Sequence, residues 1–595
     1  MLLKKTIGTH LRKCKKTEKP KKQIITLLVL SSFQPQLNYA RNLMPVPDAL
    51  SIERPRMSDI KPDELPQKKP KFRLPPIKIS PKKNPKLSTL FRVFIKKIEL
   101  SGNTVFPKQE LQQIIGKYEN RLLTNHGLQF LKYQLSQYYI EHGYINSGVI
   151  LPDQQINDGI LHLQVIEGEV SEFQITGNDW LRASYIKERV AQSFGPPLNI
   201  KSVQERLLLI QQDPLIKRIN AELRPGEKPG KSKLFLAVTE ARPYHAGVVV
   251  ANDRSPSIGG ISGKIWLRHN NLTGFGDALS FSYTAMDGLN DFSGYYSLPL
   301  TAYDTKLNFY YQYSESDVVE QPLDELLINS RAQTYGISLE QPFYRTANQS
   351  FTLSLAFEYR FSKTFLDRQP FSFSEGVPET GDDTGESRVS VLRFSQEWLD
   401  RNQKQVIAAR STFNVGINVL NATHHTDGKP DSQFFVWLGQ FQWIRRLAWL
   451  DSQVFFRTDI QLADDSLLPL EKFSIGGMHS VRGYRENQFV RDNGASSALE
   501  WRVPVFQFPI PGLSDSMADG IVQLATFLDF GWSENSATMF DESEIIGSWG
   551  LGLLWEPSAK INAEFYWGLP FYPVKEGTEH DIQDYGIHFQ INAQY

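Results

Sequence analysis

The sequence has a single cysteine among 595 residues. It also has no run of about 18 consecutive apolar residues, the length that a transmembrane helix requires. The cysteine, Cys14, lies in a basic segment near the N-terminus. The rest of the chain therefore has no thiol for a disulfide bond, a nucleophile or a cysteine-type metal site.

Motifs of common hydrolases are absent as well. The sequence has neither the Gly-x-Ser-x-Gly motif of serine hydrolases nor the His-Glu-x-x-His motif of zinc proteases. His424 and His425 are adjacent in a polar segment, but no third ligand accompanies them. We therefore predict no catalytic residues, no metal site, no cofactor and no enzymatic activity.

The formal net charge is zero, but the charge is unevenly distributed. Residues 1–90 hold 21 of the 65 basic side chains and six of the 65 acidic ones, which leaves residues 91–595 with a net charge near −15. Nucleic-acid-binding domains usually carry a basic face. An acidic body of this kind therefore argues against a nucleic-acid partner.

The first 90 residues predict an export signal followed by a tether. A basic stretch precedes a short apolar core at residues 24–30, and cleavage after Ala40 would make residues 1–40 a signal peptide. Residues 41–90 contain ten prolines and several lysine clusters. Prolines interrupt helices, so this segment is predicted to be an extended Pro/Lys-rich linker.

Residues 91–168 and 169–241 predict two small α/β domains in tandem. Each has the order strand, glycine turn, two helices, two strands, and Phe173-Gln-Ile-Thr-Gly177 repeats Ile98-Glu-Leu-Ser-Gly102. A single unrelated α/β domain would not explain the doubled order. The first strand is expected at residues 94–100, and the helices at residues 108–115, 126–142, 183–192 and 200–211.

Residues 242–595 predict a mainly β structure, a transmembrane barrel of sixteen antiparallel strands. Segments of about ten residues alternate between apolar and polar side chains and are separated by turn residues. In residues 351–361 each odd position is large and apolar, whereas the even positions include Glu358 and Arg360. Residues 585–595 alternate likewise and end in Tyr595. Alternation alone also fits two soluble β-sandwiches, but the export signal and the aromatic end favour a barrel in the outer membrane.

Two short motifs stand out within the predicted barrel. Gly476-Gly-Met-His-Ser-Val-Arg-Gly-Tyr484 lies in a long connection, and Phe527-Leu-Asp-Phe-Gly531 lies within a strand. Strand alternation places Asp529 on the same face as Phe527 and Gly531. An aspartate in the lumen needs a cation, and Arg482 on an inward-folded loop could bind it through two hydrogen bonds. The neighbouring Gly483 would let the loop backbone approach the wall closely.

Together these features resemble the two-partner secretion transporters (TpsB type), which are the haemolysin secretion/activation proteins of the outer-membrane-protein assembly superfamily. The resemblance rests on the loop motif Val481-Arg-Gly-Tyr484, the strand motif Phe527-x-Asp-x-Gly531 and the aromatic last residue. It also rests on residues 143–152 and 165–168 of the first α/β domain. Each motif alone is weak evidence for the family, whereas their combination is specific to it.

The resemblance implies two periplasmic POTRA domains, at residues 91–168 and 169–241, and a sixteen-stranded barrel at residues 242–595. A loop at about residues 466–495 would fold into the lumen, where Arg482 binds Asp529. This lumen-loop lock would consist of the following residues: Val481, Arg482, Gly483, Tyr484, Phe527, Asp529 and Gly531.

The resemblance also implies a function. The POTRA domains would capture an unfolded, exported partner protein (TpsA-like) by strand addition, and the client would pass through the barrel to the cell surface. The transporter would be a monomer surrounded by outer-membrane lipid, with its POTRA domains in the periplasm. Phe589 and Tyr595 would form the signal by which the barrel-assembly machinery inserts it.

Three alternatives remain open. A barrel-assembly or translocation-assembly factor of the same superfamily would generally have three or more POTRA domains, whereas the sequence predicts two. A passive porin would not explain the tandem α/β domains, and a barrel enzyme would need a catalytic motif. One departure from many relatives concerns a helix that plugs the barrel, because the prolines in residues 43–60 allow only a short helix at residues 48–53.

Overall fold

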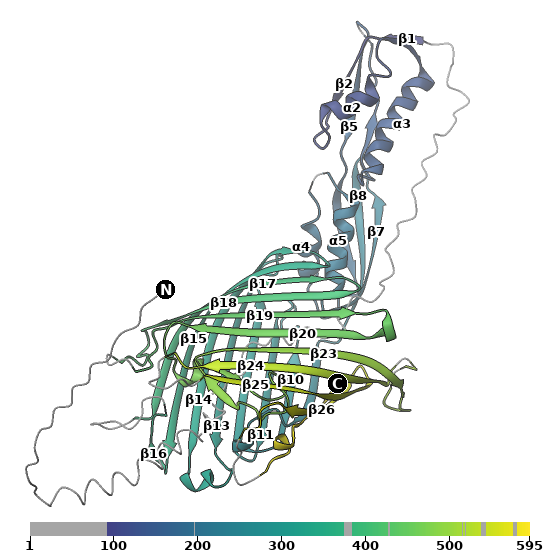
Figure 1. Ribbon diagram of the computed structural model, residues 1–595. Helices are drawn as coiled ribbons and strands as arrows, with labels where there is room; N and C mark the ends of the chain where they lie inside the picture. Colours follow the sequence, from purple (N-terminus) through teal and green to yellow (C-terminus); the bar gives the residue numbers. More distant parts are fainter. Residues whose placement is uncertain are drawn as a thin grey trace, which may run out of the picture. The chain divides into compact units, whose positions relative to one another are not determined.

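The computed structural model describes residues 92–595, except for residues 157, 196, 374–383, 426–428, 515, 518, 537–542 and 575–579. The predicted signal peptide, linker and short helix at residues 48–53 lie outside the described residues. Two α/β units and a barrel follow one another along the described part of the chain (Figure 1).

The first α/β unit departs from the predicted strand at residues 94–100. Its elements are β1 (Arg92–Ile95), β2 (Lys97–Ser101), α2 (Lys108–Ile115), β3 (Arg121–Thr124), α3 (Asn125–Glu141), β4 (Gly148–Ile150) and β5 (Ile160–Ile166). β2 and β4 pair with β5, whereas β1 pairs with β3. The chain changes partner at Lys96, because the Gly159 carbonyl accepts hydrogen bonds from the N–H groups of Lys96 and Lys97 (2.8 and 3.2 Å).

Helix α3 shows how the sequence specifies this unit. The Thr124 hydroxyl accepts a hydrogen bond from the Gly127 N–H (3.2 Å), which caps the first turn of the helix. Leu131, Leu135 and Tyr139 recur every four residues and are fully buried against the sheet. The helix therefore presents one apolar stripe to the core, as its 3.6-residue period requires.

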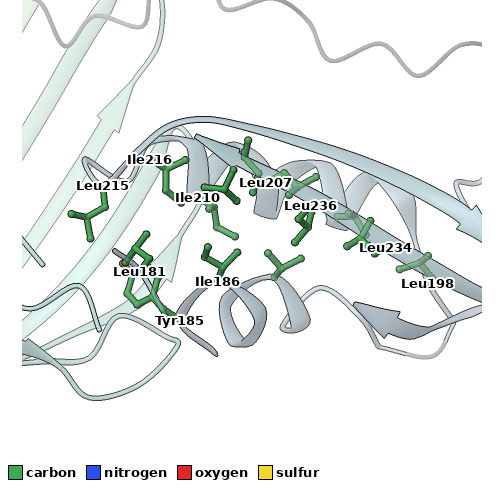
Figure 2. Close-up of a cluster of buried hydrophobic side chains, with 14 residues drawn as sticks. Leu181, Tyr185, Ile186, Leu198, Leu207, Ile210, Leu215, Ile216, Leu234 and Leu236 are labelled. Carbon is green, nitrogen blue, oxygen red and sulfur yellow. The ribbon is translucent and has the colours of Figure 1, made fainter. Parts of the chain in front are cut away.

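The second α/β unit repeats the plan of the first. Its elements are β6 (Glu169–Thr176), α4 (Ala183–Ala191), α5 (Ile200–Gln211), β7 (Ile216–Pro225) and β8 (Lys231–Glu240), with the sheet order β6-β8-β7. Figure 2 shows Ile186, Ile210 and Leu236 meeting in its core.

No helix in the described part of the chain is long and apolar enough to cross a membrane.

The glycine of the sequence repeat has the same role in both units. Gly102 and Gly177 have positive φ angles of 77° and 78°. A Cβ atom at Gly102 would lie 2.4 Å from the Val165 carbonyl oxygen, and one at Gly177 would lie 2.2 Å from that of Val238. Only glycine fits this close approach in the left-handed region.

Sixteen long antiparallel strands close into a barrel within the described residues (Figure 1). They are β9 (Tyr244–Ala251), β10 (Ser262–His269), β11 (Ala278–Met286), β12 (Leu289–Pro299), β13 (Lys306–Asp317), β14 (Asn329–Arg345), β15 (Gln349–Leu366), β17 (Glu386–Arg401), β18 (Gln405–Ile417), β19 (Phe435–Arg446), β20 (Gln453–Ala463), β23 (Asn493–Gln507), β24 (Ile521–Glu534), β25 (Glu544–Ser558), β26 (Ile561–Pro570) and β27 (Ile587–Gln594). The two-residue β16 (Gln369–Pro370) pairs with Phe365 and Leu366 of β15, beyond the part of β15 that pairs with β17. The predicted mainly β, sixteen-stranded fold is confirmed.

The barrel wall is apolar outside and polar inside. In β15, Leu355 is exposed on the outer face, whereas Glu358 and Arg360 are buried in the lumen. In β24, Leu528 is exposed outside, whereas Asp529 is buried inside. This alternation is the arrangement of a transmembrane barrel.

The last strand closes the barrel but is shorter than the predicted alternating segment. β27 begins at Ile587, because Tyr585 ends a 3₁₀ turn and Gly586 has a φ angle of 73°. β27 pairs with β9. Where β9 ends, the Asn252 side chain continues the pairing, with its amide oxygen 2.6 Å from the Phe589 N–H and its amide nitrogen 2.8 Å from the Ile587 carbonyl.

The two ends of the barrel differ in their connections. Residues 241–243 alone separate β8 from β9, so the second α/β unit adjoins the end at which β9 begins. At that end the turns include the short ones at residues 346–348 and 402–404. The connections at the other end include residues 367–385 and 464–492. Outer-membrane barrels place short turns in the periplasm and long loops outside the cell.

Candidate functional site in the barrel lumen

The connection between β20 and β23, here called the lumen loop (residues 464–492), folds back into the barrel. Within it β21 (Phe473–Ile475) pairs with β22 (Phe489–Arg491). The motif Val481-Arg-Gly-Tyr484 lies between these two strands and is buried. A segment between two strand ends would ordinarily face water, so its burial indicates that the wall holds it.

Arg482 is the centre of the contact between the lumen loop and the wall. Its Nε and Nη2 atoms donate to the two Asp529 carboxylate oxygens (2.8 and 2.9 Å), and its backbone N–H donates to Oδ2 (3.0 Å). Its Nη1 pairs with Glu500 on β23. The guanidinium also lies 3.7 Å from the centre of the Phe527 ring and 4.7 Å from that of Tyr566. The planar fork of arginine, which a lysine lacks, matches two carboxylates at once.

Gly483 brings the loop backbone against β26. It has a φ angle of 93°, and a Cβ atom there would lie 3.0 Å from the Gly568 carbonyl carbon. Its N–H donates to His588 Nε2 on β27 (3.2 Å). The loop therefore contacts β24, β26 and β27 within three residues.

We expect Gly483→Ala to lower the stability of the folded barrel. A non-glycine residue in such a backbone region costs about 1–3 kcal/mol, and the new methyl group also has to displace Gly568. Gly512→Ala is the matched control, because Gly512 has a φ angle of 86° but no atom within 4 Å of its Cβ position. The thermal stability of both variants is measured as the temperature above which the barrel no longer migrates as the fast, folded species in gel electrophoresis. Equal shifts in the two variants would show that strain alone, and not the approach to Gly568, is responsible.

The remaining motif residues surround this contact. A Cβ atom at Gly531 would lie 2.8 Å from Val481 Cγ2, so Val481 occupies the space above that glycine. The Tyr484 hydroxyl lies 3.0 Å from the carbonyl oxygens of Gly547 and Tyr572. The structure thus brings together all seven residues that the sequence assigned to the lock.

Phe589 and Tyr595 lie elsewhere, on β27 and directly after it. Tyr595 is exposed, and the Arg242 guanidinium lies 4.0 Å from its ring centre. The Tyr595 N–H donates to the Ala246 carbonyl (2.7 Å), which ties the chain end to β9. The contacts that the structure shows for the two residues are with Arg242, with β9 and the Asn252 that follows it, and with β26, outside the lumen site.

Two carboxylates of the lumen site were not predicted from the sequence. Glu500 pairs with both Arg482 and Arg502. Glu471, in the 3₁₀ turn Pro469–Glu471, pairs with Arg360 on β15 and Arg393 on β17. For Glu500 the available signal was a charged residue at a lumen-facing position of an alternating strand, as for Arg360, whereas Glu471 lies in a turn and carried no such signal. Nothing in the spacing indicated which partner would lie opposite.

Glu471 fastens the base of the lumen loop to the wall formed by β15 and β17. Its Oε1 accepts hydrogen bonds from Arg360 Nη1 and Arg393 Nη2, both at 3.0 Å. Glu358 balances the two arginines, because its Oε2 lies 2.9 Å from the Nε atoms of both, and the Tyr310 hydroxyl donates to its other oxygen. Arg482 therefore holds the loop near its tip and Glu471 holds it at its base, while Arg485 adds ion pairs with Asp584 and Glu320.

A polar cavity of about 650 Å³ lies beside this second contact. Its walls come from β13 to β20 and from the lumen loop, and they include Arg410, Gln440, Asp459 and His479. The loop therefore leaves open space in the lumen. No group of three or more residues among those described could hold a metal ion, and His424 lies 3.0 Å from Asp431.

Comparisons with known proteins agree with this architecture. The family model described as "Haemolysin secretion/activation protein ShlB/FhaC/HecB" matches residues 230–554, and the model "POTRA domain, ShlB-type" matches residues 93–168. The chain is 25% identical over 523 residues to the "Outer membrane transporter CdiB" of Escherichia coli O6:K15:H31 (strain 536 / UPEC), covering 82% of this chain and 80% of that one. It is 22% identical over 465 residues to the "Heme/hemopexin transporter protein HuxB" of Haemophilus influenzae (strain 86-028NP), covering 75% and 77%.

Solved structures share the fold. CdiB from Escherichia coli superposes with a TM-score of 0.63 at 20% identity, covering 97% of this chain and 100% of that one. BamA from Haemophilus ducreyi lacking POTRA domains 1–3 superposes with a TM-score of 0.52 at 16% identity, covering 84% and 100%.

Proposed function

Because this chain belongs to the haemolysin secretion/activation protein family, we propose that it exports an unfolded partner protein through the lumen of its barrel. It is an outer-membrane transporter of the two-partner secretion type, with POTRA structure before the barrel, and not an enzyme. Transporters of this type secrete TpsA-type partner proteins. The route through the lumen and the parts assigned to individual residues are our proposal.

The observation that carries this proposal is the lumen itself. It combines a polar cavity with a loop that contacts the wall through ion pairs and through buried apolar side chains. An extended polypeptide needs a polar path, because its backbone N–H and C=O groups have to be hydrated or paired. Because β21 and β22 of the loop pair only with each other, the loop can move without breaking the strand pairing of the barrel.

Co-expression with the candidate partner tests the proposal. The probe is the large exported protein encoded in the neighbouring reading frame, produced in a bacterium that lacks both genes. We expect this protein at the cell surface or in the medium only when the transporter is present, and in the periplasm without it. Equal amounts outside the cell in both strains would contradict the proposal.

Client capture is assigned to the open sheet edges of the α/β units. In the second unit, β7 pairs with β8 on one side only, and its other edge has no strand partner among the described residues. It is ten residues long. An unfolded client could add a strand there through main-chain hydrogen bonds, which require no fixed client sequence.

Proline substitution in β7 tests whether the client binds at the open edge of this strand. Neighbouring residues in a strand point their N–H groups to opposite sides, so one of Ala221 and Glu222 faces β8 and the other faces the open edge. Proline at the open-edge position should leave the unit folded and reduce client binding by the purified protein about tenfold, since one hydrogen bond contributes about 1 kcal/mol and the ring also blocks a neighbour. Proline at the other position should unfold the unit. Unchanged client binding by the folded proline variant would contradict capture at this edge.

The lock and the insertion signal complete the proposal. We assign Val481, Arg482, Gly483, Tyr484, Phe527, Asp529 and Gly531 to a contact that holds the lumen loop between export events. The exposed Tyr595 is assigned to recognition by the machinery that assembles the barrel, together with Phe589, which follows the buried His588 on β27 and so faces outward. The described residues before the barrel form two α/β units rather than three or more, which supports secretion over a role as an assembly factor.

A further inference from the structure

A row of charged side chains crosses the outer face of four neighbouring strands, β13, β14, β15 and β17. Glu315 is paired in register with Arg331, Arg331 with Lys363, and Lys363 with Glu386. Arg388 is the next outward-facing residue of β17. These five residues are here called the outer charged row. Such a row is unusual on a barrel wall, because charges that face lipid destabilise the barrel in proportion to their depth.

The outer charged row lies where the lipid-facing wall meets the membrane surface. Along the same face of the same strands follow Tyr311, Tyr335 and Tyr359, whose ring centres are 4.9 and 6.5 Å apart. Tyrosines at this place mark the boundary between the hydrocarbon and the head groups. The lumen cavity lies on the other face of these strands, lined by residues such as Tyr310 and Thr334.

The row belongs to the outer leaflet. Glu315 lies near the end of β13, and Glu386 is the first residue of β17, so both adjoin the long connections at residues 318–328 and 367–385. The second α/β unit adjoins the opposite end of the barrel. Since the POTRA side of the membrane is the periplasm, the row lies at the cell surface.

Within the part of the chain that the structure describes, the cations of the row are only partly satisfied. Arg331 donates one hydrogen bond from Nε to Glu315 (2.8 Å), and Arg388 Nη2 and Lys363 Nζ both pair with Glu386 (2.7 and 3.2 Å). The three cations share the carboxylates of Glu315 and Glu386, and Asp317, the next outward-facing residue of β13, also lies close enough to Arg331 for their charges to interact. Most of the N–H donors of the three cations have no acceptor among the described residues. The Arg331 side chain is 57% exposed.

We propose that the outer charged row binds the phosphate groups of an anionic lipid in the outer leaflet. At the level of the head groups, phosphate oxygens are the acceptors that guanidinium and ammonium groups meet. Arginine binds phosphate through two parallel hydrogen bonds, and each arginine of the row has terminal N–H groups left for this. Glu315 and Glu386 hold the cations in line, and the N–H groups that these carboxylates leave without an acceptor are available to the lipid phosphates.

Lipid binding to the purified full-length protein tests the proposal. The probe is diphosphoryl lipid A in neutral detergent micelles, compared with the same lipid without its phosphates. We expect the protein to prefer the phosphorylated lipid and the Arg331→Gln/Lys363→Gln/Arg388→Gln variant to bind it on the order of 100-fold more weakly, because each cation near an anionic surface contributes about a factor of five. Arg331→Gln alone should weaken binding about fivefold by the same reasoning. This single variant removes only one half-exposed ion pair, so it serves if the triple variant does not fold.

A triple variant at the other end of the barrel is the control. Lys404→Gln/Arg445→Gln/Arg446→Gln removes three exposed cations beside the short turns and should leave lipid A binding unchanged. Equal weakening in both triple variants, or none in the variants of the row, would overturn the proposal. Displacement of lipid A by an equal concentration of inorganic phosphate would also overturn it, because the site would then recognise the free anion rather than the lipid.

Discussion

Arg482→Ala is expected to reduce export of the partner protein on the order of 100-fold while the barrel remains folded and inserted. The substitution removes the cation between Asp529 and Glu500, both of which are buried. Breaking a buried ion pair by removing one partner costs about 3–5 kcal/mol, because the other charge is left uncompensated. The contact between the tip of the lumen loop and the wall is therefore strongly weakened. Export is measured as the amount of partner outside the cell relative to the amount in the periplasm.

Companion variants separate loss of the lock from general damage. Arg482→Lys keeps the charge but loses the fork, so it should restore only part of the export. Because the two residues act on each other, Arg482→Ala/Asp529→Ala should be less impaired than the sum of the single variants predicts. Arg491→Ala, in the same loop but on β22, is the matched control. Normal export by the Arg482→Ala protein would remove the lock from the mechanism.

Glu471→Gln is expected to release the base of the lumen loop. Glutamine has almost the same shape as glutamate but leaves Arg360 and Arg393 without one of their two counter-charges. Hydrogen bonds to charged groups contribute about 1.5–3 kcal/mol, so we expect export to fall roughly tenfold. We also expect purified channels in planar bilayers to show a higher and more variable ion conductance, because a freed loop base no longer fills a fixed part of the lumen.

Glu397→Gln provides the comparison for Glu471. Glu397 lines the same cavity and pairs with Arg410 on the neighbouring strand β18, so its substitution removes the same charge without touching the loop. Its conductance should stay close to that of the unaltered protein. If both variants raise the conductance equally, the lumen charge and not the anchoring of the loop is responsible.

The alternation of side chains was enough to predict the wall of the barrel and the faces of its strands. Glu358 and Arg360 could be placed in the lumen because the strand period is two residues. Their partners could not be predicted. Arg393 reaches Glu358 only because β15 pairs with β17, and Glu471 reaches both arginines only because its loop turns back across the lumen. Such contacts depend on closure of the whole barrel, which no local pattern contains.

The exact ends of strands also could not be predicted from the sequence. The segment at residues 94–100 has the composition of one strand, but the backbone of Gly159 divides it. Tyr585 continues the alternation of β27, yet Gly586 turns the chain before the strand begins. In both places a glycine, whose conformation its neighbours do not determine, overrides the side-chain pattern.

The cavity walls pair their charges within the protein, as in Glu397 with Arg410 and Glu358 with Arg393. On the proposed route, a polypeptide that passes along this wall would therefore experience little net electric field. Neither an acidic nor a basic stretch would be held strongly by the wall. Selection among client proteins would then depend on the recognition step that precedes entry.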